Sequence, residues 1–81
     1  MQKDIENIEA ELIDRIYKIF ITKYDHNKSS FAKASGCTET TIRRVLRKEQ
    51  GITINLLVRI AYALNTTVSD LMQGLQIKKD E

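Results

Sequence analysis

Residues 31–45 read FAKASGCTETTIRRV, and this stretch predicts two short helices joined by a tight turn. Gly36 stands where the first helix can end, because glycine readily adopts the positive φ that such a turn needs. Thr38 is a good N-cap for the next helix, which we expect to run from about Glu39 to Arg47.

The second of these helices has one apolar side. Ile42 and Val45, together with Cys37 in the turn, can anchor it to a core, and the small Ala32 lets the two helices cross closely. Its other faces carry Glu39, Thr40, Arg43, Arg44 and Arg47. An exposed helix face with hydroxyls and arginines is chemically matched to the DNA major groove.

The segment before this stretch predicts a long helix from about Asp4 to Tyr24. Apolar residues recur there at steps of three and four, which places them on one face of a helix. They are Ile5, Ile8, Leu12, Ile16, Ile19 and Phe20 or Tyr24. The polar residues 25–27 end this helix, and Asn27 is a plausible N-cap for the short helix that contains Phe31.

The segment after it predicts two more helices. Following a loop at residues 48–51, Thr53 can cap a fourth helix to about Leu64, and Asn65 can take the left-handed position beyond it. Thr67 can cap a short fifth helix through Met72, a residue that we expect in the core, and Gly74 ends this helix. The fold class we expect is therefore all-α, a compact five-helix bundle that contains a helix-turn-helix.

Composition excludes several other classes of protein. The 81 residues, 42% hydrophobic and 30% charged, suit one ordinary globular domain, and the lack of proline disfavours a turn-rich all-β fold. One cysteine and one histidine cannot form an intramolecular disulfide or a Cys/His metal cluster, so we expect no metal and no cofactor. No nucleophile–base pair or phosphate-binding loop is visible, so we expect no enzyme.

Charge is unevenly distributed along the chain. The formal net charge is only +2, but residues 28–59 hold 7 basic and 2 acidic residues, a local net charge of +5. A local basic face attracts polyanions even when the whole protein is nearly neutral. The acidic, amphipathic N-terminus does not resemble a signal peptide and no apolar run is long enough for a bilayer, so we expect a cytoplasmic, nucleoid-associated protein and no membrane contact.

The turn resembles the helix-turn-helix of the Cro and phage-repressor family. The matching places are Phe31, Ala32, Gly36, Cys37 and Ile42, and residues 60–65 and 67–72 look like that family's fourth-helix ending and fifth helix. The resemblance covers roughly residues 13–73. It implies a lambda-repressor-like DNA-binding domain at 13–74, preceded by an extension of the first helix at 1–12 and followed by a polar tail at 75–81.

The resemblance also implies roles for individual residues. Glu39, Thr40 and Arg44 match the family's base-reading places, and Arg43 would reach either a base or a phosphate. Lys28 matches a place that the family uses for the DNA backbone, and further phosphate candidates are Thr38, Arg47 and Lys48. Simpler roles remain open: Glu39 as a favourable first-turn acid, Thr38 as a helix cap, and both lysines as solvated charges.

The family implies a small transcriptional regulator, a repressor rather than an activator, that binds a double-stranded DNA operator as a homodimer. One module reads few base pairs, and a symmetric pair on half-sites about one helical turn (~34 Å) apart supplies the rest. The alternative is an antitoxin-like module that mainly binds a partner protein. The apolar stripe Ile5, Ile8 and Leu12 would then bind the partner protein. Otherwise the stripe would form a dimer contact or lie over the chain's own bundle.

Overall fold

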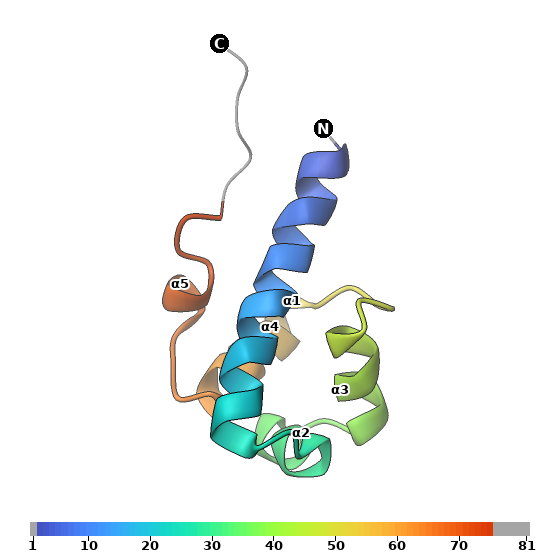
Figure 1. The fold of residues 1–81 in the computed structure, drawn as a ribbon, viewed down its shortest axis with the longest axis vertical. Coiled ribbons are helices and arrows are strands. Elements are labelled where there is room, and N and C mark those ends of the chain that lie inside the picture. Colours follow the sequence, from blue (N-terminus) through green and yellow to red (C-terminus); the bar gives the residue numbers. More distant parts are fainter. Residues whose placement is uncertain (1, 76–81) are drawn as a thin grey trace.

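The computed structural model describes the backbone of residues 2–75 and the side chains of residues 8–75. Within this part the chain is all-helical, which confirms the expected five-helix bundle. The helices are α1 Gln2–Tyr24, α2 Lys28–Ser35, α3 Glu39–Leu46, α4 Ile54–Ala63 and α5 Val68–Leu71 (Figure 1). The side chain of Ile5 and residues 76–81 of the predicted polar tail lie outside the described residues, whereas Leu75, the first residue of that tail, packs against the core.

The long helix α1 is the axis of the bundle. Figure 1 shows α3 on one side of α1, α5 on the other, and α4 behind it. The buried apolar side chains are Leu12, Ile13, Ile16, Phe20, Phe31, Ala32, Ile42, Val45, Leu57, Ile60, Ala61, Ala63, Leu64 and Leu71. Every helix contributes to this list, so the five elements share one core.

Aromatic rings fix the junction of α1 and α2. The ring centroids of Phe20 and Phe31 are 5.0 Å apart, and that of Tyr24 is 5.3 Å from Phe31. The Tyr24 hydroxyl also donates a hydrogen bond to the Ala63 carbonyl oxygen over 2.6 Å. The end of α1 is therefore hydrogen-bonded to the end of α4. This polar contact adds to the apolar packing that the sequence predicts for the helix.

An arginine joins α1 to α5. The Arg15 guanidinium donates to the carbonyl oxygens of Leu71, at 3.0 Å, and Gln73, at 2.6 Å. Carbonyl groups at the end of a helix have no partner within the helix, so these two bonds satisfy acceptors that water would otherwise have to satisfy. The short α5 is thereby held against the bundle by more than Leu71, its buried apolar side chain.

The four predicted N-caps are confirmed. The side-chain oxygen of each cap accepts a hydrogen bond from the backbone N–H three residues on, which satisfies one of the free donors of the first turn. The caps are Asn27, Thr38, Thr53 and Thr67.

Three helices end in the same left-handed turn. Gly36, Lys48 and Asn65, which follow α2, α3 and α4, have φ values of 70°, 63° and 58°. In each turn the next residue's N–H donates back to a carbonyl five residues earlier, as Cys37 does to Ala32 over 3.0 Å. This is the Schellman motif, and it confirms the predicted roles of Gly36 and Asn65.

Some expectations need correction. The fifth helix ends at Leu71, and Gly74 lies in the turn after it rather than at its end. Met72, expected in the core, is 37% exposed because it follows the last residue of that helix. Leu12 is only 4% exposed and packs in the chain's own core, so it is not available to a partner protein.

Gly36→Ala should lower the free energy of unfolding by about 1–2 kcal/mol, because an L side chain is strained in the left-handed region. A Cβ there would meet nothing closer than the Arg59 guanidinium at 3.6 Å, so the loss would come from the backbone alone. Gly51→Ala is the matched control, since a Cβ would only meet the mobile end of Glu9. Urea denaturation measures both variants, and equal stabilities would contradict the assigned role of the turn.

Candidate nucleic-acid interface

The position of α3 is set by a very short connection. α2 ends at Ser35, Gly36 makes the left-handed turn, and only Cys37 stands between it and the cap Thr38. The Thr38 hydroxyl accepts from the Thr41 N–H over 3.2 Å. With the end of one helix and the start of the next both hydrogen-bonded, the angle between α2 and α3 has little freedom.

The apolar side of α3 is fully committed to the core. Ile42 and Val45 are both 0% exposed, as the spacing predicts. Cys37 is half-buried and packs on the edge of the core, which agrees with its expected role as a small apolar anchor. The opposite side of the helix, which includes Thr40 and Arg44, is exposed to solvent.

An ion pair runs along the exposed side of α3. The Arg43 guanidinium lies 2.6 Å from the Glu39 carboxylate, one helical turn before it, and the two side chains are 53% and 40% exposed. An exposed pair of this kind stabilises a helix by only about 0.3–0.5 kcal/mol, so competing ligands can displace it. Within the described residues, Arg44 forms no ion pair and stays directed to solvent.

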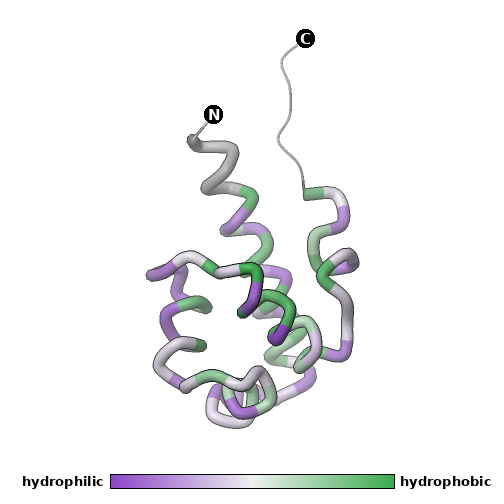
Figure 2. Tube along the Cα trace, turned by 180° about the vertical axis from the view of Figure 1, so that it is seen from behind, coloured by the Kyte–Doolittle hydropathy of each residue, from purple (hydrophilic) through white to green (hydrophobic). Residues whose placement is uncertain are grey.

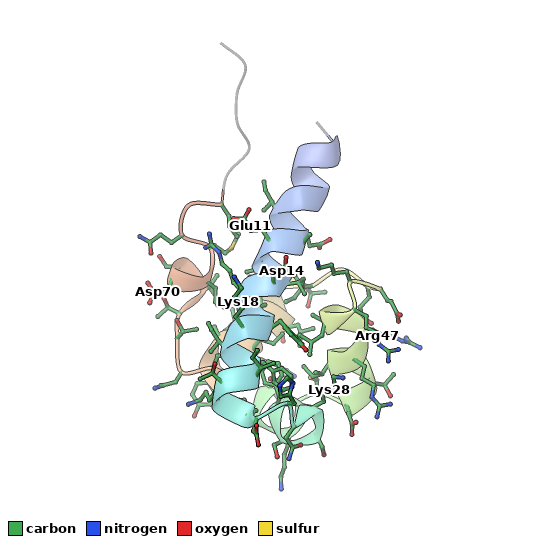
Figure 3. The ribbon with its side chains drawn as sticks, viewed as in Figure 1. Glu11, Asp14, Lys18, Lys28, Arg47 and Asp70 are labelled. Carbon is green, nitrogen blue, oxygen red and sulfur yellow. The ribbon has the colours of Figure 1, made fainter. Side chains whose placement is uncertain are left out.

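The phosphate candidates differ in their surroundings. The Lys48 ammonium lies 3.0 Å from the Asp14 carboxylate of α1, whereas Arg47 is exposed and has no ion pair within residues 8–75. Lys28 is half-buried at the first position of α2. Figure 3 shows Lys28 and Arg47 on the α2–α3 side of the bundle, far from Asp70 and α5.

Sequence reasoning missed Arg59 as a contributor to this region. Its guanidinium donates to the Gly36 carbonyl oxygen over 3.0 Å and thereby bonds α4 to the turn before α3. The two residues are 23 positions apart, and no local pattern predicts such a contact. Burial raises the pKa of the neighbouring Cys37 thiol, and the positive charge of Arg59 opposes that rise.

Residues 8–75 contain no group of three His, Cys, Asp or Glu side chains that could hold a metal ion. No described helix is long and apolar enough to span a membrane.

Comparison with known families agrees with this geometry. Residues 15–73 match the Cro/C1-type HTH DNA-binding domain. The chain belongs to this family. No curated protein and no solved structure gave a significant match. The match extends from within α1 to just beyond the end of α5, and it includes the whole of α2 and α3.

Family membership establishes DNA binding but not the role of any one residue. The fold brings Glu39, Thr40, Arg43 and Arg44 together on α3, as the sequence predicts. It also shows that Glu39 and Arg43 bind each other and that Thr38 serves as a cap in the free protein. Which of these side chains contacts bases or phosphates stays a prediction.

Alkylation of Cys37 by iodoacetamide at pH 8 should be slower in the native protein than in the urea-unfolded chain. The thiolate is the nucleophile, and a raised pKa reduces its fraction at a given pH. The native rate should also keep rising at pH values where the rate of the unfolded chain has levelled off. A native rate equal to the unfolded rate would contradict the assigned burial.

Proposed function

We propose that this Cro/C1-type protein is a transcriptional repressor that binds a palindromic operator as a homodimer with α3 in the major groove. The observation that supports it best is the exposed arginine and hydroxyl face of α3, held rigidly by the hydrogen-bonded turn at Gly36. Occupancy of a promoter suffices for repression, so no further domain is needed. The proposal places the protein in the cytoplasm, at the nucleoid.

Arg44 and Thr40 are the principal base readers in this proposal. Arg44 can donate two hydrogen bonds to guanine O6 and N7, which discriminates against a wrong base by roughly 1–3 kcal/mol. Thr40 can contact a thymine methyl group or a base edge. Arg43 leaves Glu39 for a base or a phosphate, and Glu39 is then free to accept a hydrogen bond from cytosine N4.

The phosphate contacts come from the residues around α3. Arg47 and Lys28 supply positive charge on the α2–α3 side, and the Thr38 hydroxyl can also donate to a phosphate. Lys48 takes part once phosphate displaces Asp14 from its ammonium group. These contacts fix the register of the protein on DNA without reading sequence.

The first test is selection from randomised duplex DNA, with wild type and Arg44→Ala run in parallel at about 150 mM salt. Wild type should enrich a palindromic motif, and Arg44→Ala should lose preference at one symmetric position, by about tenfold per half-site. Lys18→Ala on α1 is the control for a lost positive charge, and it should enrich the wild-type motif. Binding that is weak, salt-sensitive and without a motif would refute sequence-specific regulation by this protein alone.

A second test distinguishes Arg47, which has no ion pair within residues 8–75, from Lys48, which pairs with Asp14. Arg47→Ala should reduce the slope of log affinity against log salt by about 1, because one phosphate contact is lost. Lys48→Ala should change the slope less, because the free protein already neutralises Lys48 with Asp14. Filter binding across a salt series measures both slopes, and a larger effect for Lys48 would reverse the assignment.

The structure weakens the alternative of a partner-protein module served by the N-terminal stripe. Of that stripe, Leu12 is buried in the chain's own core, and only Ile8 remains half-buried among the side chains described. Ile8 lines an apolar groove between α1, α4 and α5, which is the part of the described stripe that a partner could still reach. We therefore place DNA binding first and treat a protein partner as a competing outcome of the interface experiments below.

A further inference from the structure

Helix α4 carries a second apolar stripe that faces away from the core. Ile54, Val58 and Tyr62 follow one another at four-residue steps and are 83%, 53% and 82% exposed. Figure 2 views the molecule from the side opposite to that of Figure 1, and there α4 stands in front of α1 with strongly apolar residues along it. We call these three residues the α4 stripe.

An apolar groove adjoins one end of the stripe. It has a volume of about 580 Å³ and lies between α1, α4 and α5. Ile54 belongs to both the stripe and the groove, whose other apolar walls include Ile8, Ile52, Val68 and Met72. The exposed side chains of Met72 and Ile54 therefore line the same groove.

The exposed apolar area of the stripe is on the order of 400 Å² per molecule, because a tyrosine alone presents about 150–250 Å². A patch of that size on a monomer is often an interaction site. Two such patches bury on the order of 800 Å² together, and the groove adds to this, whereas a stable interface buries about 1,200–2,000 Å². The area fits a weak, reversible association.

We propose that the α4 stripe is the face through which two copies of this chain associate, with the two α4 helices antiparallel. Val58 then lies at the two-fold axis, and Tyr62 of each copy lies over Ile54 of the other. Since Ile54 borders the groove, the Tyr62 ring enters it and its hydroxyl stays at the rim. Large exposed tyrosines are typical anchors of protein interfaces.

A second copy fits this face better than other occupants do. The stripe is self-complementary about Val58, as a two-fold contact requires. Arg59, the one charged residue of α4, is bonded through its guanidinium to the Gly36 carbonyl oxygen, which directs it toward the turn of its own chain. The chain's own residues 76–81 contain a single apolar residue, Ile77, too little to cover the stripe.

The contact leaves the DNA-binding face free. The stripe belongs to α4, where Val58 and Tyr62 border residues 34–36 at the end of α2, whereas the proposed base-reading residues are on α3. The inference rests on the proposed function in one respect: the α4 contact would be the interface of the dimer that binds the operator. Association through α4 is itself testable without DNA.

The experiment is sedimentation equilibrium on wild type and on the double variant Ile54→Gln, Tyr62→Gln. Wild type should dimerise with a dissociation constant of roughly 10–1,000 µM, as its small interface implies. The double variant should dimerise at least tenfold more weakly, and Tyr17→Gln, an exposed tyrosine on α1, should behave as wild type. Circular dichroism should show the wild-type helix content in all three.

Disulfide trapping locates the axis independently. In a Cys37→Ala background, Val58→Cys should form a disulfide-linked dimer under mild oxidation at least tenfold faster than Ser69→Cys, an exposed site on α5. A wild type that stays monomeric to about 1 mM, equal dimerisation of the double variant, or equal trapping at residues 58 and 69 would each overturn the proposal. Capture of a different protein by the stripe, without self-association, would overturn it as well.

DNA then separates this inference from the proposed function. The double variant should bind a half-site duplex as wild type does and bind the full palindrome at least tenfold more weakly. Equal binding of the palindrome by both proteins would refute the α4 interface and leave operator binding intact. If wild type binds no DNA selectively while the α4 dimer is found, the operator proposal fails and the interface stands.

Discussion

The structure depends on one hydrogen-bonded turn. The Cys37 N–H donates to the Ala32 carbonyl oxygen while Gly36 holds a left-handed conformation, and the cap at Thr38 begins α3 one residue later. Only Gly36 and Cys37 stand between α2 and the cap of α3, so the direction of α3 follows from that of α2. Burial of Ile42 and Val45 then fixes its rotation, and the rotation decides which side chains reach DNA.

The caps and turns of the helices were predictable from the sequence because each depends on residues that are close together in the chain. N-caps act over three residues and left-handed turns over five, so Thr38, Gly36 and Asn65 could be assigned from sequence. The left-handed Lys48 could not, since lysine has no preference for that region. Nor could Arg15, which bonds carbonyl groups 56 and 58 positions away, because such contacts exist only once the helices have packed.

The candidate site shows the same division. The apolar residues of α3 predict its buried side and leave the polar residues on the exposed side. Glu39 and Arg43 are four positions apart, and side chains at this spacing on a helix can pair. The pairing of Lys48 with Asp14 joins α1 to the end of α3 and had no local signal. Two of the predicted DNA cations are therefore paired in the free protein. The local charge of +5 already includes Glu39 but not Asp14, so only the pairing of Lys48 lowers the field that DNA first meets below what this charge suggests.

Helix α4 has more apolar surface than its own bundle needs. One side buries Leu57, Ile60 and Ala61, which completes the core, yet Ile54, Val58 and Tyr62 make a second side apolar as well. Amphipathic surface helices carry one apolar stripe, and a helix that is apolar all round is normally buried. Within the described residues the core is closed by α1 and α5, and none of the five helices covers the second stripe. A two-fold partner covers it while leaving α3 of both copies exposed, and the surplus apolar surface of α4 is then accounted for by assembly.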